Sequence, residues 1–160
     1  MKISRFLLPL KIVLLISVLI SVYITIFNGV AYFQARLQPE IQSIRTAMLQ
    51  NTILGLLYLV MTWFLFRLLI GAGNEDIISR KNLSAVKGIL YVMLGLLITK
   101  MVFAWIAAGD VKVYQNGLYF RLLNVLGASW ELLMAFMVIL ALAIVFERAV
   151  SLNEEQALTI

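Results

Sequence analysis

Four long stretches that contain at most one charged residue each dominate this chain and limit the folds open to it. They cover residues 12–33, 46–66, 88–109 and 122–146. A helix rises about 1.5 Å per residue, so about 20 residues cross the roughly 30 Å hydrocarbon core of a bilayer. Helix is the expected form, because an isolated strand would leave its backbone polar groups unpaired in lipid. With 63% hydrophobic residues and a mean hydropathy of +1.01, the composition argues against a water-soluble fold.

The sequence therefore predicts an all-α fold, with a single transmembrane domain over residues 1–160. We expect an integral membrane four-helix transmembrane bundle with short connections. The spans are expected at about 10–33, 46–69, 85–109 and 122–147, and residues 148–160 are expected to form a cytoplasmic tail. Asn116-Gly117 lies between short alternating arms, a pattern that predicts a small external β-hairpin.

The distribution of lysine and arginine predicts the orientation. Three basic residues precede the first span, four flank the second connection and one follows the last span, which makes eight on the side of the termini. Four lie on the opposite side. Because basic residues are retained on the cytoplasmic side, both termini are predicted to be cytoplasmic. The net charge of +5 is then a topology signal, and no direct nucleic-acid binding is expected.

The absence of cysteine and histidine narrows the chemistry of this chain. Without cysteine there are no disulfides and no thiolate metal sites. Without histidine the chain lacks the commonest general base and metal ligand. We expect no enzyme activity, no metal and no cofactor.

Two charged residues, Lys100 and Glu131, interrupt the third and fourth apolar stretches. Lys100 lies nine residues before Gly109, and Glu131 lies nine after Leu122, so both are expected about 13 Å below the external boundary. A charge in mid-bilayer costs about 2.5–3.5 kcal/mol on insertion scales, which favours pairing of the two groups or protonation of Glu131. Three interpretations stay open: a structural salt bridge, a proton-titrating or ligand-binding site, and independent snorkelling of the two side chains.

Small and polar residues suggest how the spans pack. One face of the first span carries small residues at intervals of four, a small-residue ridge that favours close helix packing over an ion path: Ser17, Ser21, Thr25 and Gly29. The same ridge would also suit a homo-oligomer. Four amide side chains gather toward the predicted external half and suggest a polar layer: Asn28, Gln50, Asn51 and Asn124.

The carboxyl end carries a recognisable pattern, Phe-x-x-Gly-x-x-Leu-x-x-Glu-x-Asp/Glu-Leu-Thr-Val/Ile. Six positions match it in order: Phe146, Leu152, Glu155, Leu158, Thr159 and Ile160. Ala149 replaces the glycine, and Ala157 replaces an acid. The tail resembles the closing signature of a family of small bacterial four-span membrane proteins catalogued as domain of unknown function 2975. The resemblance implies a protein of the bacterial cytoplasmic (inner) membrane without an established activity, in a family often associated with small helix-turn-helix repressors.

These observations lead to one functional hypothesis and one alternative. We predict an interaction or regulatory module that lies in the lipid bilayer and presents its middle connection and tail to a cytosolic protein partner, for which the resemblance suggests a small helix-turn-helix repressor. The tail residues expected to dock are Leu152, Glu154, Glu155, Leu158, Thr159 and Ile160. The alternative is a small proton-coupled transporter or ligand-binding membrane protein that uses Lys100 and Glu131.

Overall fold

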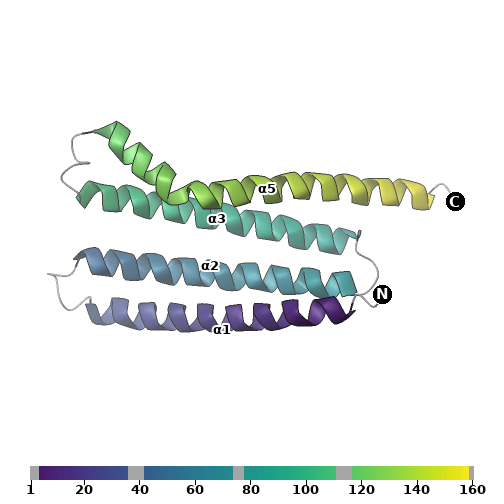
Figure 1. Ribbon diagram of the computed structural model, residues 1–160, viewed down its shortest axis with the longest axis horizontal. Helices are drawn as coiled ribbons and strands as arrows, with labels where there is room; N and C mark the ends of the chain where they lie inside the picture. The colour runs from purple at the N-terminus through teal and green to yellow at the C-terminus, as the bar shows by residue number, and fades with distance from the viewer. Residues whose placement is uncertain (1–3, 36–41, 74–77, 111–116, 159–160) are drawn as a thin grey trace.

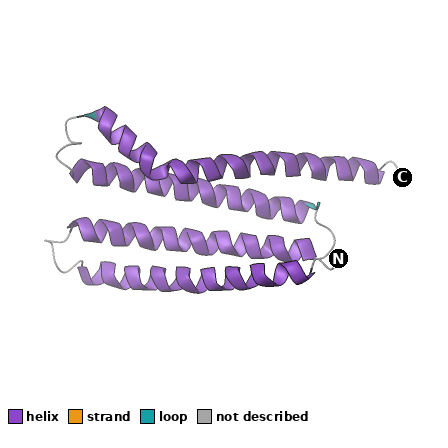
Figure 2. Ribbon diagram, viewed as in Figure 1, coloured by secondary structure: helices purple, strands orange, loops and turns teal. Residues whose placement is uncertain are grey.

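A computed structural model describes residues 4–35, 42–73, 78–110 and 117–158 of the chain (Figure 1). These residues form four helices, α1 (Ser4–Ala35), α2 (Gln42–Gly73), α3 (Arg80–Asp110) and α5 (Leu118–Leu158). The described ranges contain no strand (Figure 2). The all-α prediction is therefore confirmed.

All four helices are long and apolar enough to cross a membrane. The qualifying segments are Leu8–Gln34, Ile44–Gly71, Arg80–Ala108 and Leu118–Gln156. They overlap the four predicted spans, and each helix extends beyond the predicted bounds. Helical hydrogen bonding continues past the apolar run because it satisfies the backbone equally well in the polar region next to a membrane.

The helices alternate in direction and pack as a row. α1 packs on α2, α2 on α3 and α3 on α5, and both chain termini lie at the same end (Figure 1). The four-helix bundle is thus confirmed. Within the described residues no comparably broad contact joins α1 to α5, so the row of helices does not close into a ring.

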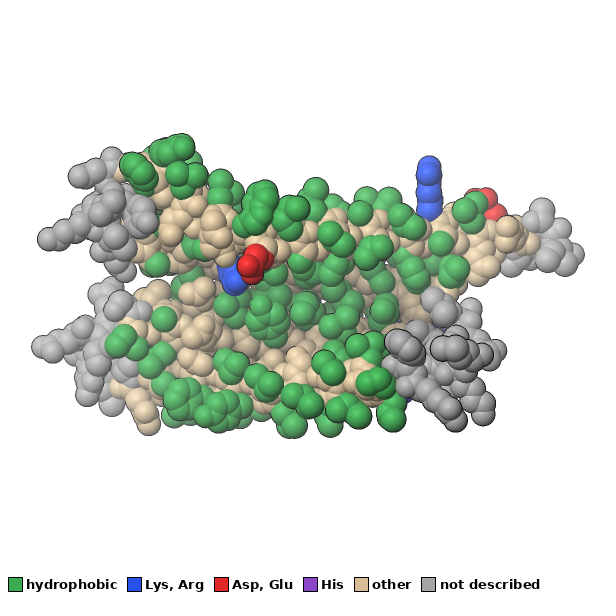
Figure 3. All heavy atoms as spheres, viewed as in Figure 1, with side chains coloured by type: hydrophobic (Ala, Val, Ile, Leu, Met, Phe, Trp, Pro, Cys, Tyr) green, Lys and Arg blue, Asp and Glu red, His purple; other side chains and the backbone are tan. Residues whose placement is uncertain are grey.

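The inner helix α3 supplies most of the buried core. Leu96 is fully buried, and its neighbours Met93, Leu97 and Phe103 are also buried. Outer helices instead expose large apolar side chains such as Tyr23, which is 68% exposed. Apolar side chains cover the long sides of the molecule (Figure 3). Such a surface suits a hydrocarbon solvent, since lipid tails are as apolar as leucine.

The small-residue ridge of α1 packs against α2. Ser21 is only 8% exposed, and the Thr25 hydroxyl donates a 2.7 Å hydrogen bond to the Ser21 carbonyl. A Cβ added to Gly55 of α2 would overlap Thr25 Oγ1, and a Cβ on Gly29 would lie 3.9 Å from Thr52 Cγ2. The two backbones approach closely here because neither side carries bulk. The packing interpretation of the ridge is confirmed.

A second close approach joins α2 to α3. A Cβ on Gly88 would overlap the ring of Phe64, and a Cβ on Gly71 would overlap the amide group of Asn82. Asn82 is buried, at 4% exposure. Glycine on one helix thus makes room for a larger side chain of the other at two levels of this interface.

The β-hairpin prediction is wrong for the second arm, which is helical. Residues 118–121 form the first turn of α5, where the Arg121 amide donates a 3.2 Å hydrogen bond to the Gly117 carbonyl. Residues 111–116, including Asn116, lie outside the described residues. Leu118 and the residues after it continue directly into the apolar stretch, so a helix satisfies their backbone without a partner strand.

Helix α5 has 41 residues and is therefore about 60 Å long, roughly twice the thickness of a hydrocarbon core. Its amino-terminal part is inclined to the remainder (Figure 1). Gly127 and Ser129 lie in this first third of the helix, and glycine and serine are common at helix bends. At the other end the helix continues without a break past Phe146. We call residues 147–158 the α5 extension; it occupies most of the predicted tail.

Candidate functional site

A cleft opens between α3 and α5 at the end of the molecule where both termini lie. Its volume is about 770 Å³. We call it the terminal cleft. It combines charged, hydroxyl and aromatic side chains from α2, α3 and α5, and its lining residues are Phe64, Arg80, Leu83, Ser84, Lys87, Gly88, Tyr91, Glu147, Val150, Ser151 and Glu154.

The α3 wall of the cleft is set by the start of that helix. The Ser79 hydroxyl accepts a 3.4 Å hydrogen bond from the backbone N–H of Asn82, and the Ser79 carbonyl accepts a 3.0 Å bond from the backbone N–H of Leu83. This is an amino-terminal cap, which satisfies backbone donors that have no partner inside the helix. The cap fixes Arg80 as the first helical residue. Arg80 and Lys87, two turns apart, then share one face.

The α5 wall carries two carboxylates that match those two cations. Arg80 Nε and Nη2 donate to the two Glu154 carboxylate oxygens at 2.5 and 2.8 Å, and Lys87 Nζ donates to Glu147 Oε1 at 2.6 Å. Glu147 and Glu154 are also seven residues apart. Antiparallel helices bring a basic pair and an acidic pair with the same spacing into register. We call this arrangement the ion-pair ladder.

The ladder is solvated rather than buried. The Arg80 and Glu154 side chains are 80% and 42% exposed. Glu154 lies eight residues beyond Phe146, where the apolar run of α5 ends, and so outside the hydrocarbon. The two hydrogen bonds from Arg80 lower the pKa of the Glu154 carboxyl below its usual value, and the Arg80 charge adds to the effect. Ion pairs this exposed stabilise weakly, so the ladder orients the α5 extension more than it stabilises the fold.

A further contact ties the extension to the residue before the cap. Asn153 Nδ2 donates a 3.4 Å hydrogen bond to the Ile78 carbonyl. Leu152 and Glu155 are exposed on the extension. Of the predicted docking residues, the structure thus brings Glu154 against α3 and leaves Leu152 and Glu155 on the surface. The helix ends at Leu158, and Thr159 and Ile160 lie outside the described residues.

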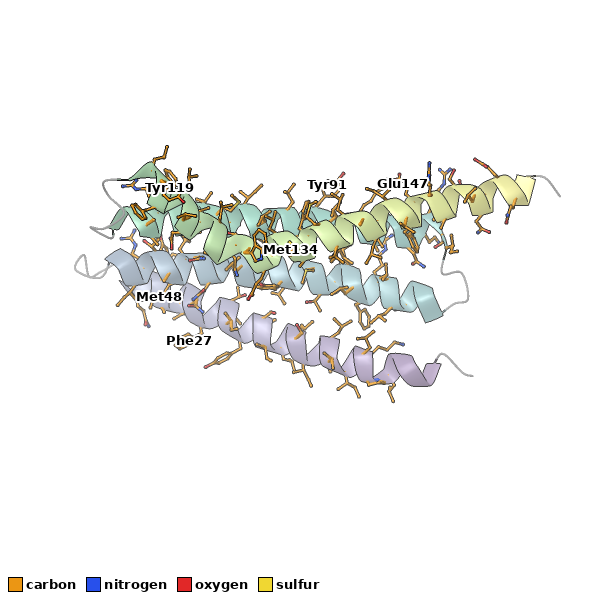
Figure 4. The ribbon with its side chains drawn as sticks, turned by 45° about the horizontal axis from the view of Figure 1, so that its top comes forward. Phe27, Met48, Tyr91, Tyr119, Met134 and Glu147 are labelled. Carbon is orange, nitrogen blue, oxygen red and sulfur yellow. The ribbon has the colours of Figure 1, made fainter. Side chains whose placement is uncertain are left out.

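Sequence reasoning missed three members of this site, Arg80, Lys87 and Glu147. In the sequence Arg80 and Lys87 counted only as basic residues that indicate topology, and Glu147 counted only as the end of the fourth span. Their pairing across α3 and α5 was therefore not predicted. The matching seven-residue spacings of the basic and acidic pairs, on helices predicted to be antiparallel, were the available signal. Tyr91 and Glu147 lie on the α3–α5 pair toward this end of the molecule, and Tyr119 lies near the opposite end (Figure 4).

The intramembrane residues Lys100 and Glu131 lie at similar depth. Lys100 is 13 residues, about 20 Å, from Lys87, and Glu131 is 16 residues, about 24 Å, from Glu147. Because Lys87 and Glu147 are bonded, the two intramembrane residues are level to within about one helical turn. Lys100 is half-buried and Glu131 is exposed.

The salt-bridge interpretation of this pair is not supported. Among the described residues the salt bridges are the two of the ion-pair ladder, and none joins Lys100 to Glu131. Glu131 shares a side of α5 with Asn124, which donates to the Ala104 carbonyl, and Ala104 lies one turn from Lys100 on α3. The two charges therefore lie on adjoining sides of α3 and α5 without forming a salt bridge.

The predicted polar layer resolves into separate contacts between neighbouring helices. Asn51 Nδ2 donates to Asn28 Oδ1 at 3.4 Å across α1 and α2, and Asn28 also donates to the Ile24 carbonyl at 2.8 Å. Asn124 Nδ2 donates to the Ala104 carbonyl at 3.4 Å across α5 and α3. Gln50 is half-buried on α2. Amide groups here connect helices in pairs, as polar groups do in membrane interiors.

Four apolar helices of membrane-spanning length, with polar contacts between helices and two salt bridges at one end, define a multi-pass membrane protein. Over residues 25–160 the chain matches the family described as protein of unknown function (DUF2975). The chain belongs to this family. No curated protein and no solved structure matches it.

Proposed function

We propose that this protein is a membrane-embedded interaction module that presents the start of α3 and the α5 extension to a cytosolic partner as a single surface. The observation that carries the proposal is the ion-pair ladder, which joins two segments far apart in the sequence. Arg80 and Glu154 are 74 residues apart and Lys87 and Glu147 are 60 apart. A partner that contacts the extension would therefore also meet the second connection.

The chemistry of the surface supports a protein partner. The extension carries an exposed apolar side chain, Leu152, which is 57% exposed, next to the carboxylates Glu154 and Glu155. An apolar anchor within a polar rim is the usual composition of a protein interface. The excess of basic residues on this side favours its exposure to the bacterial cytoplasm. A small helix-turn-helix repressor is the partner that the family resemblance suggests.

Co-purification from native membranes in a mild detergent tests the proposal. The intact protein is expected to retain a stable cytosolic partner, and a variant that lacks residues 153–160 is expected to lose it while inserting normally. Leu152→Ser is the finer variant, because it removes the apolar anchor and leaves the ladder in place. Glu131→Gln, which changes a residue far from the cleft, is the matched control and is expected to keep the partner. The absence of any stable partner of the intact protein would refute the proposal.

A second candidate, a small proton-coupled transporter, is favoured by the level depth of Lys100 and Glu131 and by the exposure of Glu131. Ionisable groups within transmembrane helices often mark proton and ion paths. If Glu131 carries protons, Glu131→Gln stops pH-dependent flux in proteoliposomes and spares partner capture. Unchanged flux in that variant would eliminate the transporter hypothesis.

A further inference from the structure

We infer that the terminal cleft binds the headgroup of a zwitterionic aminophospholipid, a lipid of the phosphatidylethanolamine class. The phosphate group lies against the basic α3 wall, and the ammonium group lies against the acidic α5 wall. This inference goes beyond the proposed protein partner, because the exposed residues expected to meet that partner, Leu152 and Glu155, do not line the cleft.

The cleft lies at the depth where the hydrocarbon of a bilayer meets its headgroups. Lys87 directly precedes the uncharged run of α3, and Glu147 directly follows Phe146, where the apolar run of α5 ends. The Lys87–Glu147 pair therefore marks the hydrocarbon boundary. Arg80 and Glu154 lie seven residues, about 10 Å, farther from the hydrocarbon. The headgroup layer on each side of a bilayer is about 5–8 Å thick, so the space between the two ion pairs is at headgroup depth.

The lining of the cleft changes from polar to aromatic toward the membrane. Ser84 lies between Arg80 and Lys87 on α3, and Ser151 lies between the two glutamates on α5. Both serines are exposed, so their hydroxyls are accessible to a phosphate group. Tyr91, one turn from Lys87 toward the hydrocarbon, is 70% exposed, and tyrosine is typical of membrane interfaces. A phospholipid has the same order of groups, a charged headgroup followed by apolar chains, whereas a soluble phosphate compound has no part that matches the aromatic end.

The charges of the cleft favour a zwitterionic headgroup. Both cations, Arg80 and Lys87, are on the α3 wall, and both carboxylates are on the α5 wall, so their charges cancel. Within the described residues, Arg80 donates two of its five N–H groups to Glu154, and Lys87 donates one of its three to Glu147. Donors on the α3 wall therefore remain for a phosphate group. A zwitterion complements both walls and keeps the cleft neutral, whereas an anionic headgroup would leave one unbalanced charge beside the hydrocarbon.

Lipid retention by the intact protein tests the headgroup. The purified protein is exposed in a mild detergent to equal amounts of phosphatidylethanolamine and phosphatidylglycerol with identical acyl chains, and bound lipid is counted by native mass spectrometry. Phosphatidylethanolamine is expected in about fivefold excess, which corresponds to about 1 kcal/mol. Equal retention of the two lipids would overturn the inference. Glycerophosphoethanolamine, the same headgroup without acyl chains, is expected not to displace the lipid at equal concentration, and displacement would overturn the assignment to a lipid.

Two variants connect the lipid preference to the cleft. Ser84→Ala/Ser151→Ala removes two exposed hydroxyls, leaves the ion-pair ladder in place and is expected to lower retention of phosphatidylethanolamine about fivefold. Glu147→Gln leaves the cleft with one positive charge and is expected to retain phosphatidylglycerol in preference to phosphatidylethanolamine. Leu152→Ser, in the same extension but outside the cleft lining, is the matched control and is expected to keep the lipid while it loses the proposed protein partner. Unchanged lipid binding in either cleft variant, or loss of the lipid in the control, would overturn the inference.

Discussion

The close contact between Gly55 of α2 and Thr25 of α1 predicts that Gly55→Ala destabilises the protein. The added methyl group would overlap Thr25 Oγ1 and would also lie 3.3 Å from Thr25 Cβ and 3.5 Å from the Ser21 carbonyl oxygen. To relieve the overlap, either Thr25 rotates and loses its 2.7 Å hydrogen bond to the Ser21 carbonyl, or the two helices move apart. Overpacking of this kind typically costs about 1–3 kcal/mol, so the free energy of unfolding should fall by that amount.

A double-mutant cycle isolates the cause. Thr25→Ala alone removes one hydroxyl hydrogen bond and should cost about 0.5–1 kcal/mol. It also removes the atom that the new methyl group overlaps, and the remaining contacts of 3.3 and 3.5 Å need only small shifts. The double variant Gly55→Ala/Thr25→Ala should therefore be more stable than Gly55→Ala, with a coupling free energy of about 1–3 kcal/mol.

Reversible unfolding in mixed micelles, titrated with a denaturing detergent and followed by helical circular dichroism, measures these free energies. Gly29→Ala is the matched control in the same interface, because its Cβ would lie 3.9 Å from Thr52 Cγ2, an ordinary contact distance. It should be neutral, or stabilising by up to about 1 kcal/mol from the higher helix propensity of alanine. If Thr25→Ala fails to rescue Gly55→Ala, the two helices do not approach each other as described.

Three further outcomes test other parts of the structure. Gly88→Ala should lower the free energy of unfolding by about 1–3 kcal/mol in the same assay, because its Cβ would overlap the Phe64 ring. Ser79→Ala should cost about 1 kcal/mol and raise amide hydrogen exchange in the first turn of α3, since it removes the cap. Glu154 has a folded-state pKa below its ordinary value of 4.5, so its pairing with Arg80 stabilises the fold above that pH and is lost as the pH falls below it. Protection of the α5 extension from amide exchange, taken relative to the intrinsic exchange rate at each pH, should therefore fall as the pH drops below 4.5, and Glu154→Gln should show low protection at every pH; an identical protection profile for both proteins would contradict the pairing.

Sequence reasoning succeeded where one physical requirement outweighs all others. In hydrocarbon every backbone polar group needs a partner within its own segment, so the apolar stretches had to form helices, and the small-residue ridge had to face another helix. It failed at Leu118–Arg121, where a turn signal at Asn116-Gly117 suggested a strand. The stretch continues into a span, and the requirement for helix extended through it.

Only part of the candidate site was predicted from the sequence. Glu154 was singled out in the tail, but its partner Arg80 lies 74 residues away and was noted only as a basic flank. Spacing along one helix shows which residues share a face, but it does not show which face of another helix they meet. The same limit applied to Lys100 and Glu131, whose similar depth followed from counting residues but whose lack of a salt bridge did not.

The sequence by itself determined the number of helices, their alternating direction and the depth of each residue along them, because rise per residue and the need for internal hydrogen bonds are local properties of the chain. The tertiary structure decided which helices touch, how each is rotated about its axis, and therefore that Arg80 meets Glu154 and Lys87 meets Glu147. Rotation and neighbourhood depend on packing between distant segments, where a glycine such as Gly55 admits a close approach that no single helix specifies.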